Sequence, residues 1–291
     1  MKHLSIALLT LTSLLVTALA DVTTPEITVE QAQSLFDKRL EDAKNAYKAA
    51  EICKDLAQSE NDDLIKNNLL QKEAEYIYYY AGKQTSKNKK LKYYSRGFQA
   101  ALNATKLIVD ENDPAKARSD ELKDELASGY YWYAAHLGKW GETKGILASL
   151  GKWPTLKKYL LYIIKLDKTV HNYGGNRILG RAYMKVPIES KTKGLALLKE
   201  AYENSISQEL LEQEDISLSR TMTNNVFYLE ALEARNQTDD FCQLYDNIEM
   251  LNELSDEAKK ILNPGSFPET LDGLDSIYSN DDLTEYAEEN C

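Results

Sequence analysis

The chain has 291 residues and a formal net charge of −11, with 46 Asp and Glu against 35 Lys and Arg. So acidic a chain repels phosphate backbones and anionic lipid, which argues against nucleic acid and acidic membranes as general partners. Only six prolines and thirteen glycines occur, and between them apolar residues return every three to four positions, the spacing of helices. The sequence therefore predicts an all-α protein with ample core.

The first twenty residues have the pattern of a secretory signal peptide. Lys2 and His3 precede an apolar run that ends in Ala18-Leu19-Ala20, a small-x-small cleavage pattern. The alternative is an N-terminal membrane anchor, but the run is marginal in length for a span and carries five hydroxyl groups. Asp21, not a cysteine, stands directly after it, and no later segment approaches ~20 uninterrupted apolar residues. We expect cleavage near residue 20, export to the periplasm or a similar compartment, and a soluble mature protein without a stable membrane span.

The mature chain divides into a helical-repeat domain, residues 21–263, and an acidic C-terminal tail, residues 264–291, expected to lie over the surface or to fray. Thr28 and Gln31 fit a capping box at the start of the first helix, and Pro154 suits the first turn of another. In chain order, helices are predicted over residues 29–58, 62–81, 87–109, 115–139, 154–166, 176–185, 192–205, 215–234 and 239–251.

These helices follow one another as pairs joined by short turns, and one pair resembles a tetratricopeptide repeat. Leu179, Gly180 and Tyr183 match the small-residue core of the first helix of that repeat, because a glycine lets the partner helix approach closely. Gly194 and Leu198 fit the second helix after a longer turn. The sequence thus predicts stacked helix-turn-helix pairs with degenerate repeats, and an irregular helical bundle is the alternative.

The three cysteines are Cys53, Cys242 and Cys291. In an exported chain an odd number permits one disulfide and one free thiol. A bond between Cys242 and Cys291 would pin the acidic tail, and the sequence leaves this pairing open because it gives no distance. Cys53 lies on an apolar helical stripe, which predicts a buried thiol.

Residues suited to catalysis are scarce. After loss of His3, only His136 and His171 remain, and neither has neighbours at metal-ligand spacing. No nucleophile elbow occurs, and nothing places two carboxylates at the separation that an all-helical glycosidase needs. We therefore expect no enzyme, no metal and no cofactor, and a function in binding.

Tyrosine is unusually frequent, with nineteen against five phenylalanines, and tyrosine suits surfaces that are half apolar and half wet. One interpretation is packing between repeats. The other is an aromatic-lined cleft for a small apolar or amphipathic ligand. Arg177 and Arg181, one helical turn apart, could pair either with a ligand carboxylate or with acids of the chain itself. The candidate ligand or partner cleft comprises Trp132, Tyr133, His136, Trp140, Trp153, Arg177 and Tyr183.

Two segments resemble a known family. Residues 129–140 (GYYWYAAHLGKW) and 173–183 (YGGNRILGRAY), with Leu166-Asp167 between them and Pro187 after them, resemble the T component associated with tripartite ATP-independent periplasmic (TRAP) transporters. The resemblance covers about residues 90–255. It implies a periplasmic protein with tetratricopeptide-like pairs that associates with a solute-binding subunit and handles hydrophobic or carboxylate ligands.

Members of that family are often lipid-anchored, whereas this chain has no cysteine at the expected cleavage point. The sequence therefore predicts a non-catalytic periplasmic binding or scaffold protein with a protein partner and a small apolar or carboxylate ligand. The alternative is a tetratricopeptide-type adaptor for envelope assembly without a small-molecule site. A homo-oligomer is left open.

Overall fold

In the computed structural model, residues 28–253 and 281–291 are described. Within these ranges the regular elements are helices, without a β-strand, and only two isolated bridges occur, Val109–Ala117 and Ile206–Ser219. This confirms the all-α fold class. The predicted signal peptide and most of the predicted tail lie outside these ranges. No helix among the described residues is long and apolar enough to span a bilayer.

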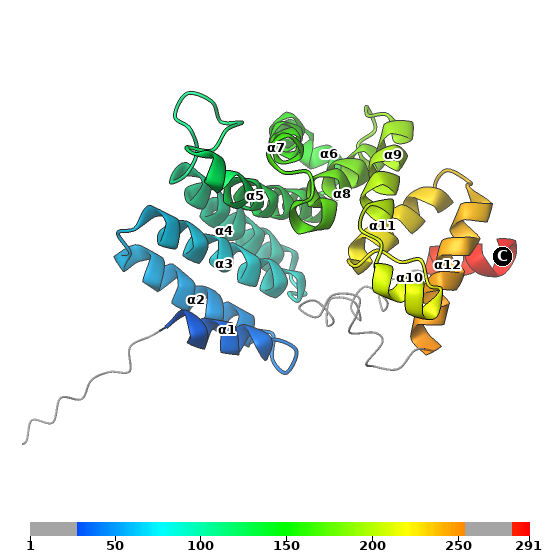
Figure 1. The fold of residues 1–291 in the computed structure, drawn as a ribbon, viewed down its shortest axis with the longest axis horizontal. Helices are drawn as coiled ribbons and strands as arrows, with labels where there is room; N and C mark the ends of the chain where they lie inside the picture. Colours follow the sequence, from blue (N-terminus) through cyan, green and yellow to red (C-terminus); the bar gives the residue numbers. More distant parts are fainter. Residues whose placement is uncertain (1–27, 254–280) are drawn as a thin grey trace, which may run out of the picture.

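The N-terminal part of the chain forms a layered stack in which each helix packs on its neighbours in sequence (Figure 1). The capping box of Thr28 and Gln31 forms as predicted at its first helix. The 3-10 helix η1 (Asp120–Leu122) leads into the last helix of the stack. The helices are α1 (Val29–Asp37), α2 (Lys44–Ser59), α3 (Asp63–Gly82), α4 (Lys87–Lys106) and α5 (Lys123–Lys144).

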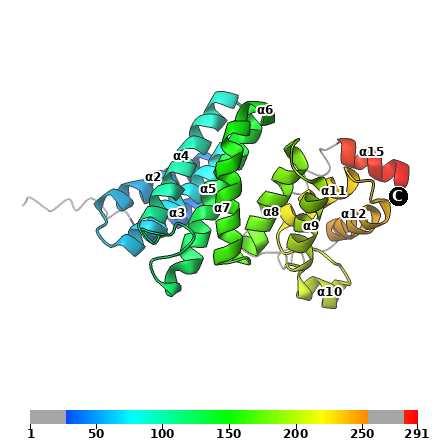
Figure 2. The same cartoon turned by 90° about the horizontal axis from the view of Figure 1, so that it is seen from above.

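The C-terminal part continues the helical path and turns away from the stack, as Figure 2 shows from above. Helix α8 packs on α5 and α7 on one side and on α9 and α11 on the other, so it joins the two parts. The elements are α6 (Ile146–Ser149), η2 (Leu150–Lys152), α7 (Trp153–Leu166), α8 (Val170–Lys185), α9 (Lys191–Glu203), α10 (Gln208–Glu214), α11 (Met222–Glu233), α12 (Thr238–Glu253) and α15 (Asp281–Asn290).

Three apolar clusters make up the core. The first joins α1, α2 and α3 around Phe36 and Tyr76, whose rings stack 4.2 Å apart between centroids. The second runs from α3 to α8 and includes Leu160. The third joins α9 to α15 around Leu229 and Phe241. Cys53 is fully buried in the first cluster, which confirms the prediction of a buried thiol.

The pair α8–α9 shows the close packing expected from the tetratricopeptide-like residues. A Cβ added at Gly180 would lie 2.7 Å from Leu198 and 3.0 Å from the carbonyl oxygen of Gly194. A Cβ at Gly194 would likewise lie 3.0 Å from the carbonyl oxygen of Gly180. The two backbones therefore touch at this crossing, and any side chain would force them apart.

The single helix predicted over residues 29–58 is wrong, because the chain reverses at residues 38–43 and forms the antiparallel pair α1–α2. Arg39 stabilises the reversal: its guanidinium lies 4.3 Å over the Phe36 ring, and its Nη1 donates to the Phe36 carbonyl oxygen at 3.2 Å. Leu40, which a continuous helix over residues 29–58 would place on the same face as Phe36, is 53% exposed in the turn.

The helix predicted over residues 115–139 begins later, at Lys123, because the preceding loop has polar bonds of its own. The carboxylate of Asp110 accepts from the backbone N–H groups of Asn112 and Asp113, at 2.8 and 3.0 Å. Such local side-chain bonds offer the backbone an alternative to helix.

The helix predicted over residues 215–234 starts only at Met222. Asp215 takes the left-handed conformation, with φ 56°, and ends α10. The extended stretch after it has its own buried partners: the Asn225 side chain accepts from Ser219 N at 2.8 Å. Tertiary hydrogen bonds thus replace helical ones.

Of the two alternatives for the tail, lying over the surface or fraying, fraying is wrong for residues 281–291. They form α15, which packs on α12 and buries Leu283 and Ala287. The structure also settles the open cysteine pairing, because Cys242 and Cys291 form a disulfide with their Cα atoms 5.5 Å apart.

Candidate functional site

A recess of about 90 Å³ opens between α5, α6, α7 and α8. Its wall is mainly apolar, which suits a hydrocarbon group more than a charged one. The indole ring of Trp153 is fixed in this wall because its Nε1 donates to Glu189 Oε1 at 2.7 Å. The principal apolar residues of the wall are Leu137, Ile146, Leu150, Trp153, Ile178 and Val186.

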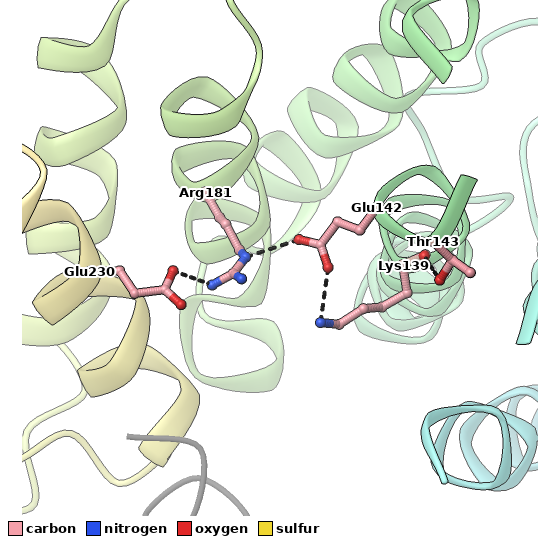
Figure 3. A network of polar contacts seen from close by, with 5 residues as sticks. All are labelled: Lys139, Glu142, Thr143, Arg181 and Glu230. Carbon is pink, nitrogen blue, oxygen red and sulfur yellow. Dashed lines mark hydrogen bonds and ion pairs between the residues drawn. The ribbon is translucent and has the colours of Figure 1, made fainter. Parts of the chain in front are cut away.

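One side of the recess is formed by an ion-pair network, drawn in Figure 3. Arg181 Nε bonds Glu142 Oε1 at 3.0 Å, and its Nη1 bonds Glu230 Oε2 at 2.6 Å. Lys139 Nζ bonds the other oxygen of Glu142 at 3.0 Å. Burial would raise the pKa of Glu142, but Lys139 and Arg181 outweigh it and hold that pKa below its ordinary value. The network joins α5, α8 and α11.

Two further cations line the recess without such partners. Lys152 and Lys185 are exposed, and no ion pair within the described part of the chain involves either of them. An apolar recess with free ammonium groups at its mouth matches a ligand that has a hydrocarbon part and a negative group.

Two predicted cleft residues lie at this recess. Trp153 lines it, and Tyr183 packs against the Trp153 ring with 5.9 Å between centroids. The ammonium group of Lys157 sits over both rings, at 5.6 and 4.9 Å from their centroids. This arrangement fixes the two rings in place behind the apolar wall. Trp140 is half-buried and packs against the second core cluster.

Two others lie within the core instead. His136 is fully buried, and its Nε2 lies 2.8 Å from the carbonyl oxygen of Ala74. Burial lowers the pKa of His136 to about 4, so the ring is neutral at physiological pH. Tyr133 is 8% exposed and contacts Phe98 and Tyr159. Both residues pack helices together.

The remaining two, Trp132 and Arg177, adjoin a strained turn at the start of α8. Three consecutive residues, His171, Asn172 and Tyr173, take left-handed backbone angles, with φ of 50°, 52° and 60°. Such angles are rare for non-glycine residues and persist only where surrounding contacts enforce them. Trp132 contributes one of those contacts, with its ring 5.3 Å from that of His171.

Arg177 ties this turn to the rest of the molecule. Its Nη1 donates to the carbonyl oxygens of His171 and Asn172, at 3.3 and 3.4 Å, and to Asn224 Oδ1 at 2.8 Å. Its Nη2 donates to the hydroxyl of Tyr131 at 2.8 Å. These hydrogen-bond partners of the buried guanidinium are neutral oxygens, so the geometry gives Arg177 a structural task inside the fold.

Next to it, Ser128 Oγ lies 3.0 Å from His171 Nε2, and the His171 ring stacks on Tyr131 at 4.1 Å. Burial, followed by the nearby Arg177, lowers the pKa of His171 to about 4. A serine beside a neutral histidine is half of a nucleophilic site. Among the described residues no carboxylate is hydrogen-bonded to this imidazole, so the third, orienting group of such a site is not supplied.

The predicted residues are therefore distributed over three places and do not form one cleft. The sequence did not predict the recess, because small residues such as Gly138, Gly141 and Ala182 create it. Small residues do not stand out in a sequence pattern that is defined by large apolar side chains. In the described ranges, no group of three or more His, Cys, Asp or Glu could hold a metal ion.

A second, wider groove of about 840 Å³ crosses α2, α3 and α4. Arg96 lies in it between two carboxylates, with its Nε 2.8 Å from Glu73 Oε1 and its Nη1 bonded to Glu51. Tyr47 and Tyr93 also line it. Its lining mixes polar and apolar residues, as protein interfaces do, although a volume of this size would also admit a small molecule.

No protein-family model matches the chain, and no curated protein matches it either. The assignment to the TRAP T-component family thus remains a prediction that rests on residues 129–140 and 173–183.

Proposed function

We propose that this chain is an exported, non-catalytic binding protein whose recess between α5 and α8 holds the apolar end of a small carboxylate ligand. A protein partner would dock on its helical surface. This is the role implied by the resemblance to TRAP T components, with a periplasmic solute-binding subunit as the partner. The recess is the observation that carries the proposal: its wall is apolar, and Lys152 and Lys185 at its edge lack counterions among the described residues.

The size of the recess limits what it takes. About 90 Å³ is several times the roughly 10–15 Å³ that one water molecule needs, which leaves room for the end of an alkyl chain. Water in such an apolar space lacks hydrogen-bond partners, so its replacement by hydrocarbon is favourable. The carboxylate would remain at the edge, near the lysines.

Isothermal titration with octanoate tests the proposal, with octanol as the uncharged comparison. We expect Ala182→Leu, which adds bulk to the recess wall, to weaken octanoate binding by about tenfold, as expected for loss of a buried hydrocarbon group. Ala148→Leu is the matched control, since Ala148 is exposed on α6 and does not line the recess. Absence of octanoate binding, or equal effects of the two variants, would contradict the recess as a ligand site.

The two lysines give a second test of the same site. The double variant Lys152→Gln with Lys185→Gln should weaken octanoate binding and leave octanol binding unchanged, because only octanoate carries a charge. Equal loss for both ligands would show that the lysines do not recognise a carboxylate.

The wide groove over α2 to α4 favours the second candidate function, a protein adaptor without a small-molecule site. Native mass spectrometry of the protein purified from an exporting host separates the two. A co-purified small molecule supports the ligand-binding protein. A ligand-free mass with a bound protein supports the adaptor.

A further inference from the structure

The charges of the helical stack are segregated between its two ends. The turn after α1, the start of α4 and the end of α5 lie at one end, which we call the basic end and define as residues 38–44, 83–92 and 144–147. It holds nine Lys and Arg residues and two acids. The opposite end, residues 60–63 and 106–125, holds ten acids and four Lys and Arg residues. The overall charge of −11 therefore does not describe the basic end.

Contacts within the structure bring these turns together. Arg39, in the turn after α1, lies 5.4 Å from the ring centroid of Tyr79 at the end of α3. Lys87 Nζ, at the start of α4, reaches the carbonyl oxygen of Lys144 at the end of α5. Figure 1 shows the turn after α1 and the turn between α3 and α4 on the same side of the stack.

The position of the lysines works against the stability of α4. Lys87, Lys89 and Lys90 stand in its first turn, which has no acidic residue, and Ser86 makes no side-chain capping bond. The helix dipole makes the N-terminus positive, so cations there are unfavourable. No ion pair in the described ranges offsets the charge of these three residues. Their charges are therefore not balanced within the described part of the fold and remain available to an anionic partner.

The basic end also exposes large apolar side chains. Leu147 on α6 is 75% exposed, and Leu40 in the turn after α1 is 53% exposed. Apolar side chains among lysines are the composition of surfaces that rest on a bilayer, where the lysines meet anionic headgroups and the leucines enter the acyl boundary.

We propose that the basic end docks on the surface of an anionic phospholipid bilayer. Lys87, Lys89 and Lys90 provide the charge attraction, and Leu40 and Leu147 provide apolar contact. The acidic end then points away from the membrane, since the same surface repels it. The long helices of the stack would therefore point away from the membrane surface, in one defined orientation.

Sedimentation with vesicles tests this on the full chain. Vesicles of phosphatidylcholine with 30% phosphatidylglycerol are compared with vesicles of phosphatidylcholine alone. Binding to the uncharged vesicles measures the contribution of the apolar first twenty residues, which does not depend on lipid charge. We expect stronger binding to the anionic vesicles, lost as salt is raised. The triple variant Lys87→Gln, Lys89→Gln, Lys90→Gln should lower the partition coefficient by about tenfold or more, since each lysine near an anionic surface contributes to attraction.

The matched control is Lys106→Gln, Lys116→Gln, Lys123→Gln, which changes the net charge equally at the acidic end. We expect it to bind almost as the wild type does. Leu147→Ser should lower binding several-fold without unfolding the protein, because the side chain is exposed. Thermal unfolding of the α4 triple variant should be unchanged or slightly raised, which separates lost docking from lost folding.

Three results would overturn the proposal. The first is equal binding to neutral and anionic vesicles. The second is an equal loss in the two triple variants, which would show that only net charge matters. The third is salt-sensitive head-to-tail association of the protein in solution without vesicle binding, which would assign the two charged ends to each other.

Discussion

The ring of His136 on α5 occupies the space beside Gly97 on α4. A Cβ added at Gly97 would lie 1.9 Å from the imidazole ring, which is fully buried and is bonded to the carbonyl oxygen of Ala74. The contact fixes how closely α4 approaches α5. A residue suspected of ligand binding thus has a packing role that depends on its glycine partner.

We expect Gly97→Ala to lower the free energy of unfolding by about 1–3 kcal/mol, because overpacking a core displaces its side chains. Urea denaturation measures the change. Gly151→Ala is the control, since nothing lies within 4 Å of its added Cβ. A stability equal to that of the wild type in Gly97→Ala would show that the ring can move aside.

The buried His136 also predicts a pH dependence of stability. Burial lowers its pKa from 6.5 to about 4 in the folded state, so the unfolded chain takes up a proton at higher pH than the folded one. Its contribution is therefore complete above pH 6.5 and is lost as the pH falls toward 4. Between pH 7 and pH 5 this residue should account for about 2 kcal/mol of lost stability.

Two measurements check this. In His136→Gln, the loss of unfolding free energy between pH 7 and pH 5 should be smaller than in the wild type by that amount. In the wild type, an NMR titration should show the rings of both His136 and His171 staying neutral to about pH 4, and the signal that is lost in His136→Gln identifies the His136 ring. A ring that titrates near 6.5 at this position would contradict the buried environment.

At the scale of elements, the left-handed turn that opens α8 is the most constrained segment. Three residues, 171–173, hold unfavourable backbone angles, each at a cost of order 1–3 kcal/mol. The guanidinium group of Arg177 donates hydrogen bonds to two of their carbonyl oxygens, those of His171 and Asn172. Gly174 adds to the constraint, because a Cβ there would lie 2.4 Å from the Tyr131 ring.

We expect Arg177→Lys to destabilise the protein by about 2–4 kcal/mol, since lysine keeps the charge but cannot reach several oxygens at once. Chemical denaturation and amide exchange at residues 171–177 measure it. Arg118→Lys is the control, because Arg118 makes an exposed ion pair with Asp63, a contact worth less than about 1 kcal/mol. Similar effects of both substitutions would show that the guanidinium group does not hold the turn.

Most helices could be predicted from apolar periodicity, and the starts at Thr28 and Pro154 from capping and proline rules. The errors occurred where polar side chains bond the backbone. Asp110 bonds the backbone of the loop that precedes α5, and Arg39 stabilises the turn between α1 and α2. Such bonds depend on a few side chains and do not interrupt the spacing of the apolar residues. The sequence therefore predicts one continuous helix where the structure has a helix, a loop and a second helix.

The candidate site could be predicted only in part, for a related reason. Helical spacing places Trp132, Tyr133, His136 and Trp140 on one broad side of α5, but it does not say which neighbour each one meets. Only Trp153 of the predicted residues lines the recess. The recess depends on how α6 and η2 bend between α5 and α7, and short irregular helices carry no strong pattern.

At the scale of the whole molecule, the disulfide holds the last helix in place. Cys242 and Cys291 are 49 residues apart, and closing a loop of that size stabilises the folded state by about 4 kcal/mol in the chain-entropy model. We expect Cys291→Ser to lose about that much stability and to make α15 sensitive to proteolysis. A reducing agent should have the same effect on the wild type.

The control is the variant itself: a reducing agent should not lower the stability of Cys291→Ser any further, because Cys53 is unpaired and buried. Thermal unfolding with and without dithiothreitol makes the comparison. If the wild type and Cys291→Ser unfold at the same temperature under oxidising conditions, the bond does not support the fold.

The backbone contact between Gly180 and Gly194 sets a limit on how this shape can change during evolution. Elsewhere in the stack a larger side chain on one helix can be offset by a smaller one on the next. At this crossing a smaller neighbouring side chain such as Leu198 would not suffice, since each glycine also faces the carbonyl oxygen of the other, and a backbone atom cannot be reduced. Any homologue that keeps the same distance between these two helix axes must therefore keep glycine at both positions. This gives a criterion for recognising distant homologues whose overall sequence identity is low.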